Sequence, residues 1–200
     1  MGLFATMPVD EVTVQDIANA VEMTPAAVYY HFASKEQILL EGMERFRDQL
    51  LAEVRSAVPA AGDTDGVHQV VVHVLAWVSR HRTPATVYFV NSIGLNLLVE
   101  ALRRETRLEL VGLLRDAVVA ARGRLARAEA GVIAVGLVSL IETSLASMLN
   151  QDATHRSLGN RRPISVQQAC TMQYSGRGIV AKALDWNDSG SWRCFKVGYS

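Results

Sequence analysis

Three helix-start signals lie close together near the beginning of this 200-residue chain, between Thr13 and Ser34. Thr13 with Asp16 has the form of a capping box, in which the threonine hydroxyl and the acidic side chain each accept a backbone hydrogen bond. Thr24 followed by Pro25 repeats the signal, because proline suits the first position of a helix. Ser34, with a glutamine three residues later, starts a third helix. This spacing predicts two short helices joined by a tight turn and followed by a long helix.

The remainder of the chain also has helical periodicity. Apolar residues between Val67 and Val78 recur at the i, i+3, i+4 spacing of one helical face, which favours a helix there. A strand is the alternative, because the segment is rich in β-branched residues. The segment 128–149 is apolar nearly all round and contains small residues, which indicates burial on more than one side. Further helices are expected at 84–93, 98–125 and 166–184. The sequence therefore predicts an all-α protein.

Composition and motifs exclude several classes of protein. The longest near-continuous apolar run, Ala130 to Ile141, has twelve residues, so no membrane-spanning helix is expected. The N-terminus lacks the basic and apolar segments of a secretory signal, so we expect a cytoplasmic protein. Cys170 and Cys194 are near neither a second cysteine nor a histidine cluster, so neither a metal site nor a disulfide scaffold is expected. The sequence contains no nucleophile, phosphate-loop or zinc-protease motif, so we predict a non-enzyme without catalytic residues or cofactors.

The stretch VTVQDIANAVEMTPAAVYYHFASKEQIL resembles the DNA-binding module of the tetracycline-repressor (TetR) family. The positions that carry the resemblance are Thr13, Asp16-Ile17-Ala18, Thr24, Val28-Tyr29-Tyr30-His31-Phe32 and Ser34-Lys35-Glu36. The match extends over about thirty residues without a gap, whereas the rest of the chain resembles the family only in its general layout. The resemblance implies a helix-turn-helix module followed by a larger helical ligand-binding and dimerisation domain. It also implies a ligand-responsive transcriptional regulator, a repressor, that binds operator DNA as a homodimer and is released by a small apolar or amphipathic effector.

The resemblance implies that DNA contacts come from the second short helix and from its neighbours. The candidates are Thr13, Thr24, Pro25, Ala26, Ala27, Tyr29, Tyr30, His31 and Lys35. Helix N-termini bind phosphates well, but each threonine is first a structural cap. The resemblance pairs Lys35 with a backbone phosphate, and a solvated lysine is the alternative. For His31 the alternative is a structural hydrogen bond. The expected core positions are Ile17, Ala18, Val21, Val28 and Phe32.

The larger domain offers only scattered candidates for a ligand pocket. They are His73, Trp77, Tyr88, Asn91 and Glu142. Each of them also has a bland interpretation as a packing or surface residue. We expect an apolar or amphipathic ligand, because the helices are rich in valine and leucine. The alternative function is a helical ligand-binding dimer that has lost effective DNA binding.

The N-terminus departs from the family pattern. In the family, a first helix that usually ends in L-F-A packs across the other two. Here Leu3-Phe4-Ala5 comes almost at once, so most of that helix is expected to be absent. Residues 1–50 contain three basic and eight acidic side chains, a net charge of −5. Two explanations stay open, a misassigned chain start and a truncated regulator. In either case we expect this chain to bind DNA poorly, because phosphate neutralisation supplies much of the affinity.

These observations predict three parts of the chain. Residues 1–48 form the helix-turn-helix module, with its first helix truncated, and residues 49–185 form the helical ligand-binding and dimerisation domain. Residues 186–200, which follow neither a helical nor an alternating pattern, are expected to be a disordered tail. The homodimer is expected to form through the helices at 128–149 and 166–184.

Overall fold

Helices make up most of the computed structural model. It describes residues 1–58, 66–121, 127–157, 169–175, 178–186 and 192–197. The first helices are α1 (Gly2–Thr6), α2 (Val14–Ala20), α3 (Pro25–His31) and α4 (Lys35–Ala57). They are followed by α5 (Gly66–Arg80), α6 (Arg82–Thr86), the π-helix η1 (Val87–Asn91), α7 (Leu97–Ala121) and α8 (Arg127–Ser157).

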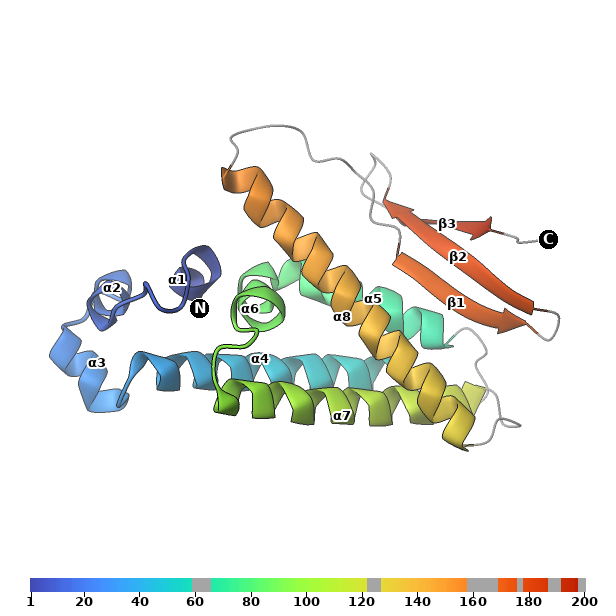
Figure 1. The fold of residues 1–200 in the computed structure, drawn as a ribbon, viewed down its shortest axis with the longest axis horizontal. Coiled ribbons are helices and arrows are strands. Elements are labelled where there is room, and N and C mark those ends of the chain that lie inside the picture. Colours follow the sequence, from blue (N-terminus) through green and yellow to red (C-terminus); the bar gives the residue numbers. More distant parts are fainter. Residues whose placement is uncertain (59–65, 122–126, 158–168, 176–177, 187–191, 198–200) are drawn as a thin grey trace.

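The long helix α4 joins the two parts of the molecule. Helices α2 and α3 lie at its N-terminal end, and its remaining length packs against α5 and α7 (Figure 1). Helix α8 crosses this layer diagonally and packs along α7. The predicted border at residue 48 therefore falls inside one continuous helix, so α4 belongs both to the small N-terminal module and to the larger domain.

The core of the larger domain is built around an aromatic cluster. Phe46 of α4 is only 1% exposed. Its ring centroid lies 5.5 Å from that of Trp77, 5.3 Å from that of Tyr88 and 6.1 Å from that of Phe89. Burial of such a ring stabilises a fold by about 1.5–3 kcal/mol, and aromatic pairs at these distances add to that. The cluster therefore joins α4, α5 and η1 at the centre of the molecule.

Most of the predicted helices are confirmed. Residues 67–78 lie in α5, and Val70, Val74 and Val78 are buried on one face of it, so the helix is correct and the strand alternative is wrong. Helix α7 contains the predicted segment 98–125 as far as Ala121, the last four residues of that prediction lying outside the described residues, and α8 contains all of 128–149. The helical fold class, a small N-terminal module with a larger helical domain, is confirmed for these parts of the chain.

The prediction for the C-terminal segment is wrong. The helix expected at 166–184 is replaced by β1 (Ala169–Ser175) and β2 (Gly178–Trp186), and β3 (Trp192–Val197) lies where a disordered tail was expected. The three strands form an antiparallel sheet in the order β1-β2-β3. Ser175 of β1 pairs with Gly178 of β2. The sequence has glycines at 176 and 178, and glycine disfavours a helix interior, a signal that the helical interpretation underweighted.

Helix α8 is more apolar than the sequence analysis inferred. Within the described residues, the part of α8 from Arg127 to Asn150 contains an 18-residue window with a mean hydropathy of 2.0, and it is long enough, by length and composition alone, to cross a membrane. The twelve-residue run was too short a measure, because it ended at the isolated Glu142. In the fold this helix packs against α7, and Ala134 and Leu145 are fully buried. Helix α8 is therefore a core helix of the larger domain, although only 28% of that apolar window is buried within one chain.

Candidate nucleic-acid interface and ligand cavity

The capping box at the start of α2 is confirmed. The Thr13 hydroxyl accepts a hydrogen bond from the Asp16 backbone N–H at 3.1 Å. The Asp16 carboxylate in turn accepts from the Thr13 hydroxyl at 2.5 Å and from the Thr13 N–H at 2.9 Å. The hydrogen bond from the Thr13 side chain, followed by that from its backbone, lowers the pKa of Asp16. The folded module therefore favours the ionised carboxylate at this helix N-terminus.

The turn between α2 and α3 contains a strained residue that sequence reasoning missed. Glu22 has a φ of 55°, in the left-handed region that favours glycine. The turn is closed by a hydrogen bond from the Met23 N–H to the Ala18 carbonyl at 2.9 Å. Helix α3 then begins as predicted, with the Thr24 hydroxyl accepting from the Ala27 N–H at 3.2 Å. A glutamate gives no sequence signal for a left-handed turn, which is why this feature was not predicted.

The outer face of α3 brings most of the predicted DNA-contact residues together. Tyr30 is 85% exposed and Tyr29 is 57% exposed. Ala26 and His31 are also exposed, whereas Pro25 and Ala27 are half-buried. The Tyr30 and His31 rings meet edge to face, with their centroids 5.1 Å apart. A short helix with an exposed aromatic face of this kind can enter a major groove, where its side chains reach base edges and phosphates.

The inner face of the module agrees with the sequence analysis only in part. Ala18 and Val28 are buried as expected, and Ile17 and Phe32 are half-buried. Val21 was predicted to be in the core, but 54% of it is exposed, so that prediction is wrong. The reason is that α1 packs against α6 and η1 and therefore does not cover this end of α2.

Lys35 does not face outward. Its ammonium donates to the carbonyl oxygens of Val9 at 2.9 Å, Asp10 at 3.0 Å and Val12 at 2.9 Å. The lysine lies directly after Ser34, whose hydroxyl caps α4 by accepting from the Gln37 N–H at 3.3 Å. The alternative of a solvated lysine is therefore wrong, and the ammonium is bound within the chain.

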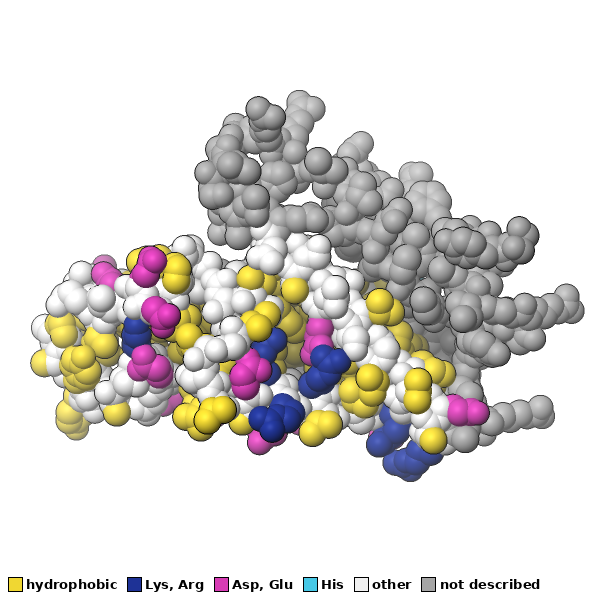
Figure 2. Space-filling view, viewed as in Figure 1, with side chains coloured by type: hydrophobic (Ala, Val, Ile, Leu, Met, Phe, Trp, Pro, Cys, Tyr) yellow, Lys and Arg dark blue, Asp and Glu magenta, His cyan; other side chains and the backbone are white. Residues whose placement is uncertain are grey.

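Acidic side chains dominate the charge of the N-terminal module. Lys35 is the only lysine or arginine in the first 44 residues of the sequence. On the face shown in Figure 2, Asp and Glu side chains are the prominent charged groups over the end that carries α1–α3, whereas arginines gather over the larger domain. A DNA phosphate approaching α3 therefore meets little positive side-chain charge.

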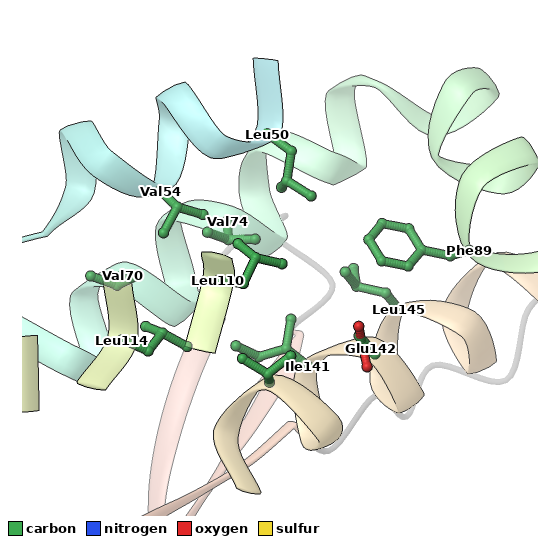
Figure 3. Close-up of a pocket in the computed structure, with 11 residues that line it drawn as sticks. Leu50, Val54, Val70, Val74, Phe89, Leu110, Leu114, Ile141, Glu142 and Leu145 are labelled. Atoms are coloured by element: carbon green, nitrogen blue, oxygen red, sulfur yellow. The ribbon is translucent and has the colours of Figure 1, made fainter. Parts of the chain in front are cut away.

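A small apolar cavity lies between the long helices of the larger domain (Figure 3). Its lining comes from α4, α5, η1, α7 and α8: Leu50, Val54, Val70, Val74, Phe89, Leu110, Leu114, Val138, Ile141, Glu142 and Leu145. The space open to the centre of a water molecule is about 30 Å³, room for about two waters. Among these lining residues Glu142 is the only one with a polar side chain.

Glu142 is held at the cavity wall by arginines of α7. It forms an ion pair with Arg107, which also donates to the Ser139 hydroxyl at 2.8 Å. Burial raises the pKa of Glu142, and the charges of Arg107 and Arg103 partly oppose that rise. The carboxylate therefore combines an apolar surrounding with one strong partner, and it can still accept a hydrogen bond from a bound molecule.

The other four pocket candidates lie elsewhere. The His73 ring is 2.8 Å from the Glu53 carboxylate at the α4–α5 contact. Trp77 belongs to the aromatic cluster and stacks on His81, with the ring centroids 4.2 Å apart. Asn91 donates from its side chain to the Phe4 carbonyl at 2.9 Å. These side chains take part in contacts between helices and do not line the cavity.

Tyr88 is a core residue with an unusual neighbour. The Arg103 guanidinium lies 5.3 Å from the Tyr88 ring centroid and also donates to the Tyr88 carbonyl. Burial raises the pKa of the phenol, with smaller opposing effects from Thr106 and Arg103. Phe89, its neighbour in η1, lines the cavity instead. No sequence signal distinguished the two, because both are aromatic residues in the same apolar segment.

A helix-turn-helix at the end of a helical domain with an internal apolar cavity has the architecture of a helical transcriptional regulator. Residues 1–41 match the family model of bacterial regulatory proteins, tetR family. These residues therefore resemble the DNA-binding module of that family, and the chain has the fold of solved regulators of the same family.

Several solved structures share this fold. FadR, a fatty acid degradation regulator from Bacillus halodurans, is 14% identical, with a TM-score of 0.62 over 76% of this chain and 84% of that one. A TetR-family regulator from Bordetella parapertussis is 22% identical, with a TM-score of 0.59 over 80% and 92%. The ketosteroid transcriptional regulator KstR2 of Mycobacterium tuberculosis is 19% identical, with a TM-score of 0.54 over 80% and 81%. No curated protein sequence matches the chain.

Proposed function

We propose that the protein is a ligand-responsive transcriptional repressor that binds operator DNA as a homodimer in the cytoplasm. The observation that carries the proposal is the exposed α3 face, centred on Tyr30, in a module of the tetR family. Thr13 and Thr24 cap the two helices of the motif, and their N-termini can receive phosphates once DNA is present. Tyr30, Tyr29 and His31 are then the side chains placed to contact bases and the backbone.

The cavity supports an effector with an apolar body and one hydrogen-bond donor. Its walls are valine, leucine, isoleucine and phenylalanine side chains, and Glu142 supplies a carboxylate acceptor at one side. The space is far below the 300–1,000 Å³ typical of ligand sites, so the effector must widen it. A wider cavity would move α8 away from α4 or α7. Because α4 continues into the DNA-binding module, such a movement would also change the position of that module.

The homodimer is proposed to form through α8. Its outer face exposes Val132 (74%), Val135 and Leu140 beside Gly136. An apolar face of this size on a soluble regulator favours coverage by a second copy, with a small residue allowing close approach. The segment 166–184, proposed earlier as the second interface helix, forms strands and no longer supports a helical interface.

A glycine pair tests this dimer. A Cβ at Gly136 or at Gly112 meets nothing within 4 Å in the chain, so either residue can be enlarged without a clash inside the protomer. We expect Gly136→Leu to weaken the dimer in sedimentation equilibrium, because the larger side chain separates the facing helices. Gly112→Leu on α7 is the matched control and leaves the dimer constant unchanged. A monomeric wild-type protein at micromolar concentration would contradict the proposal.

The DNA-binding role is tested by selecting duplexes from a random pool with the wild-type protein. Tyr30→Ala is expected to change preference among the selected sequences, because a base-edge contact contributes about 1–3 kcal/mol of discrimination. We expect the wild-type affinity to be weak at physiological salt and to rise steeply as salt is lowered. Nanomolar binding at physiological salt would show that the acidic module loses less affinity than we infer.

A second candidate function is a helical ligand-binding dimer that has lost effective DNA binding. The observation in its favour is that residues 1–50 have a net charge of −5 and that Lys35 is bound within the chain. The same selection separates the two functions. Recovery of no enriched sequence at low salt, from protein that is folded and dimeric, would favour the second candidate.

A further inference from the structure

The connection between α1 and α2 leaves several backbone carbonyls without a partner in regular structure. Residues 8–11 form a turn that is closed by a hydrogen bond from the Glu11 N–H to the Pro8 carbonyl at 3.1 Å. The carbonyls of Val9, Asp10 and Val12 lie outside both helices. Val9 and Val12 are themselves buried, so the segment is held against the core. The hydrogen bonds at the Val9 and Val12 carbonyls are part-buried, whereas that at the Asp10 carbonyl is exposed. A part-buried carbonyl needs a donor, because an unpaired polar group away from water is costly.

The Lys35 ammonium supplies that donor to all three carbonyls. The three nitrogen–oxygen distances lie between 2.9 and 3.0 Å. An ammonium has three N–H groups and no acceptor, so three hydrogen bonds use its full capacity. The contacts join residues 23 to 26 positions apart in the sequence. Lys35 is the first residue of α4, the helix that comes after α3, and these bonds fix it to the segment that leads into α2.

We propose that Lys35 is a positioning residue that fixes the α1–α2 connection against the start of α4 and so sets the orientation of α3. This role replaces the phosphate contact that the family resemblance implied. A phosphate could accept a hydrogen bond from the Lys35 ammonium only if one of the three carbonyls lost its donor. Hydrogen bonds from a charged donor are the strong ones, and breaking one leaves a carbonyl unpaired, so the exchange gains little.

Two substitutions separate the positioning role from the phosphate role. Lys35→Met keeps most of the side-chain length and removes the charge, whereas Lys35→Arg keeps the charge but offers a planar fork that cannot converge on three carbonyls. Arg45→Met is the matched control, because Arg45 is an exposed residue of the same helix and its loss removes the same charge. The Tm of each variant is measured first. Amide hydrogen exchange, and DNA affinity at several salt concentrations, are then measured at a temperature well below that Tm.

The positioning role predicts that both Lys35 variants lose stability. We expect Tm to fall by about 5 °C or more in Lys35→Met, since three carbonyls lose a charged donor. Exchange of the Glu11 amide, whose hydrogen bond closes the turn, should accelerate about tenfold or more in both variants. Arg45→Met should leave the Tm and this exchange rate as in the wild type. These readouts do not depend on DNA binding, so they decide the inference even where the proposed function fails.

Where DNA binding is measurable, the salt slope gives an independent result. A lost phosphate contact makes the log–log slope less negative by about 0.9. The positioning role predicts weaker binding by folded Lys35→Met with the wild-type slope, and similarly weak binding by Lys35→Arg. An unchanged Tm and unchanged exchange, with a slope reduced by one phosphate and full rescue by arginine, would overturn the inference. If Lys35→Met does not fold, the arginine variant decides alone, because only the phosphate role predicts that it equals the wild type.

Discussion

The N-terminal module and the core of the larger domain are held together by different interactions. In the module, helices of only five to seven residues depend on side chains that bond to the backbone, namely Thr13, Thr24 and Lys35. In the larger domain, Phe46 packs among three aromatic rings and the surrounding valines and leucines. Helices this short are not stable in isolation, so these polar contacts add to the burial of Phe4, Val9 and Val12 against the core.

This difference predicts which substitutions each region tolerates. A capping hydroxyl or an ammonium among three carbonyls has a defined geometry, and few other side chains reproduce it. An apolar core accepts substitutions that conserve volume and loses stability mainly when a cavity opens. The module should therefore respond to single polar atoms, whereas the larger domain should respond to lost volume.

The largest expected effect is that of Phe46→Ala. Removing a ring that is 1% exposed and contacts Trp77, Tyr88 and Phe89 should lower the free energy of unfolding by about 3–5 kcal/mol. Urea titration followed by circular dichroism measures it. Leu108→Ala, at a residue that is 68% exposed on α7, is the control and should change stability by less than about 0.5 kcal/mol. Equal effects of the two substitutions would contradict the claim that apolar burial stabilises the larger domain.

A smaller effect is expected from the cap of α3. Thr24→Ala removes the hydroxyl that accepts the Ala27 N–H, which should cost about 1 kcal/mol. Hydrogen exchange should show the loss within α3 and not in α7. Thr24→Ser keeps the oxygen and should retain nearly all of the protection. Equal loss of protection in α3 and α7 would mean that the module has no stability of its own to lose.

The turn residue Glu22 is expected to give a gain of similar or smaller size. Glu22→Gly places glycine at a φ of 55° and should stabilise the turn by up to about 1 kcal/mol, although the unfolded chain also gains freedom. Glu22→Gln keeps the strain and removes only the charge, so it isolates the electrostatic part. Thermal unfolding of the two variants measures the difference. A glutamine variant that is as stable as the glycine variant would assign the gain to charge.

The smallest effects are two pH dependences of opposite sign. The lowered pKa of Asp16 means that its ionised form stabilises the module, so this contribution is present above its ordinary pKa of 3.8 and is lost as the pH falls below it. The raised pKa of Glu142 means that ionisation destabilises the larger domain, so stability falls as the pH rises from 4.5 through the raised value. The free energy of unfolding of Asp16→Asn and of Glu142→Gln is measured between pH 3 and 7. Asp16→Asn should remove the loss of stability at low pH, and Glu142→Gln should remove the loss of stability as the pH rises. Parallel trends in both variants would contradict the assignment.

More of the N-terminal module than of the larger domain could be predicted from the sequence. The cap at Thr13 was predictable from Asp16 three positions later, and the cap at Thr24 from the proline that follows it. The partners of Lys35 were not, since three backbone carbonyls carry no signature in residue type. The cavity was located only through Glu142, because its valines and leucines have the same periodicity as any buried helix. Strands β1 and β2 were missed for a related reason, because their apolar content also fits a helix, and β3 was missed because its residues follow neither a helical nor an alternating pattern.

The π-helix η1 has a consequence for how the two regions meet. Within its five residues Phe89 lines the cavity and Asn91 donates to the Phe4 carbonyl of α1. Its wide turn is marked by the hydrogen bond from the Ser92 N–H to the Val87 carbonyl at 3.0 Å, five residues back. One residue more than an α-helical turn advances the side chains that follow by about 100° around the axis. The extra residue in the π-helical turn therefore changes the direction in which the following side chains point. As a result η1 contacts the cavity through Phe89 and the Phe4 carbonyl of α1 through the Asn91 amide.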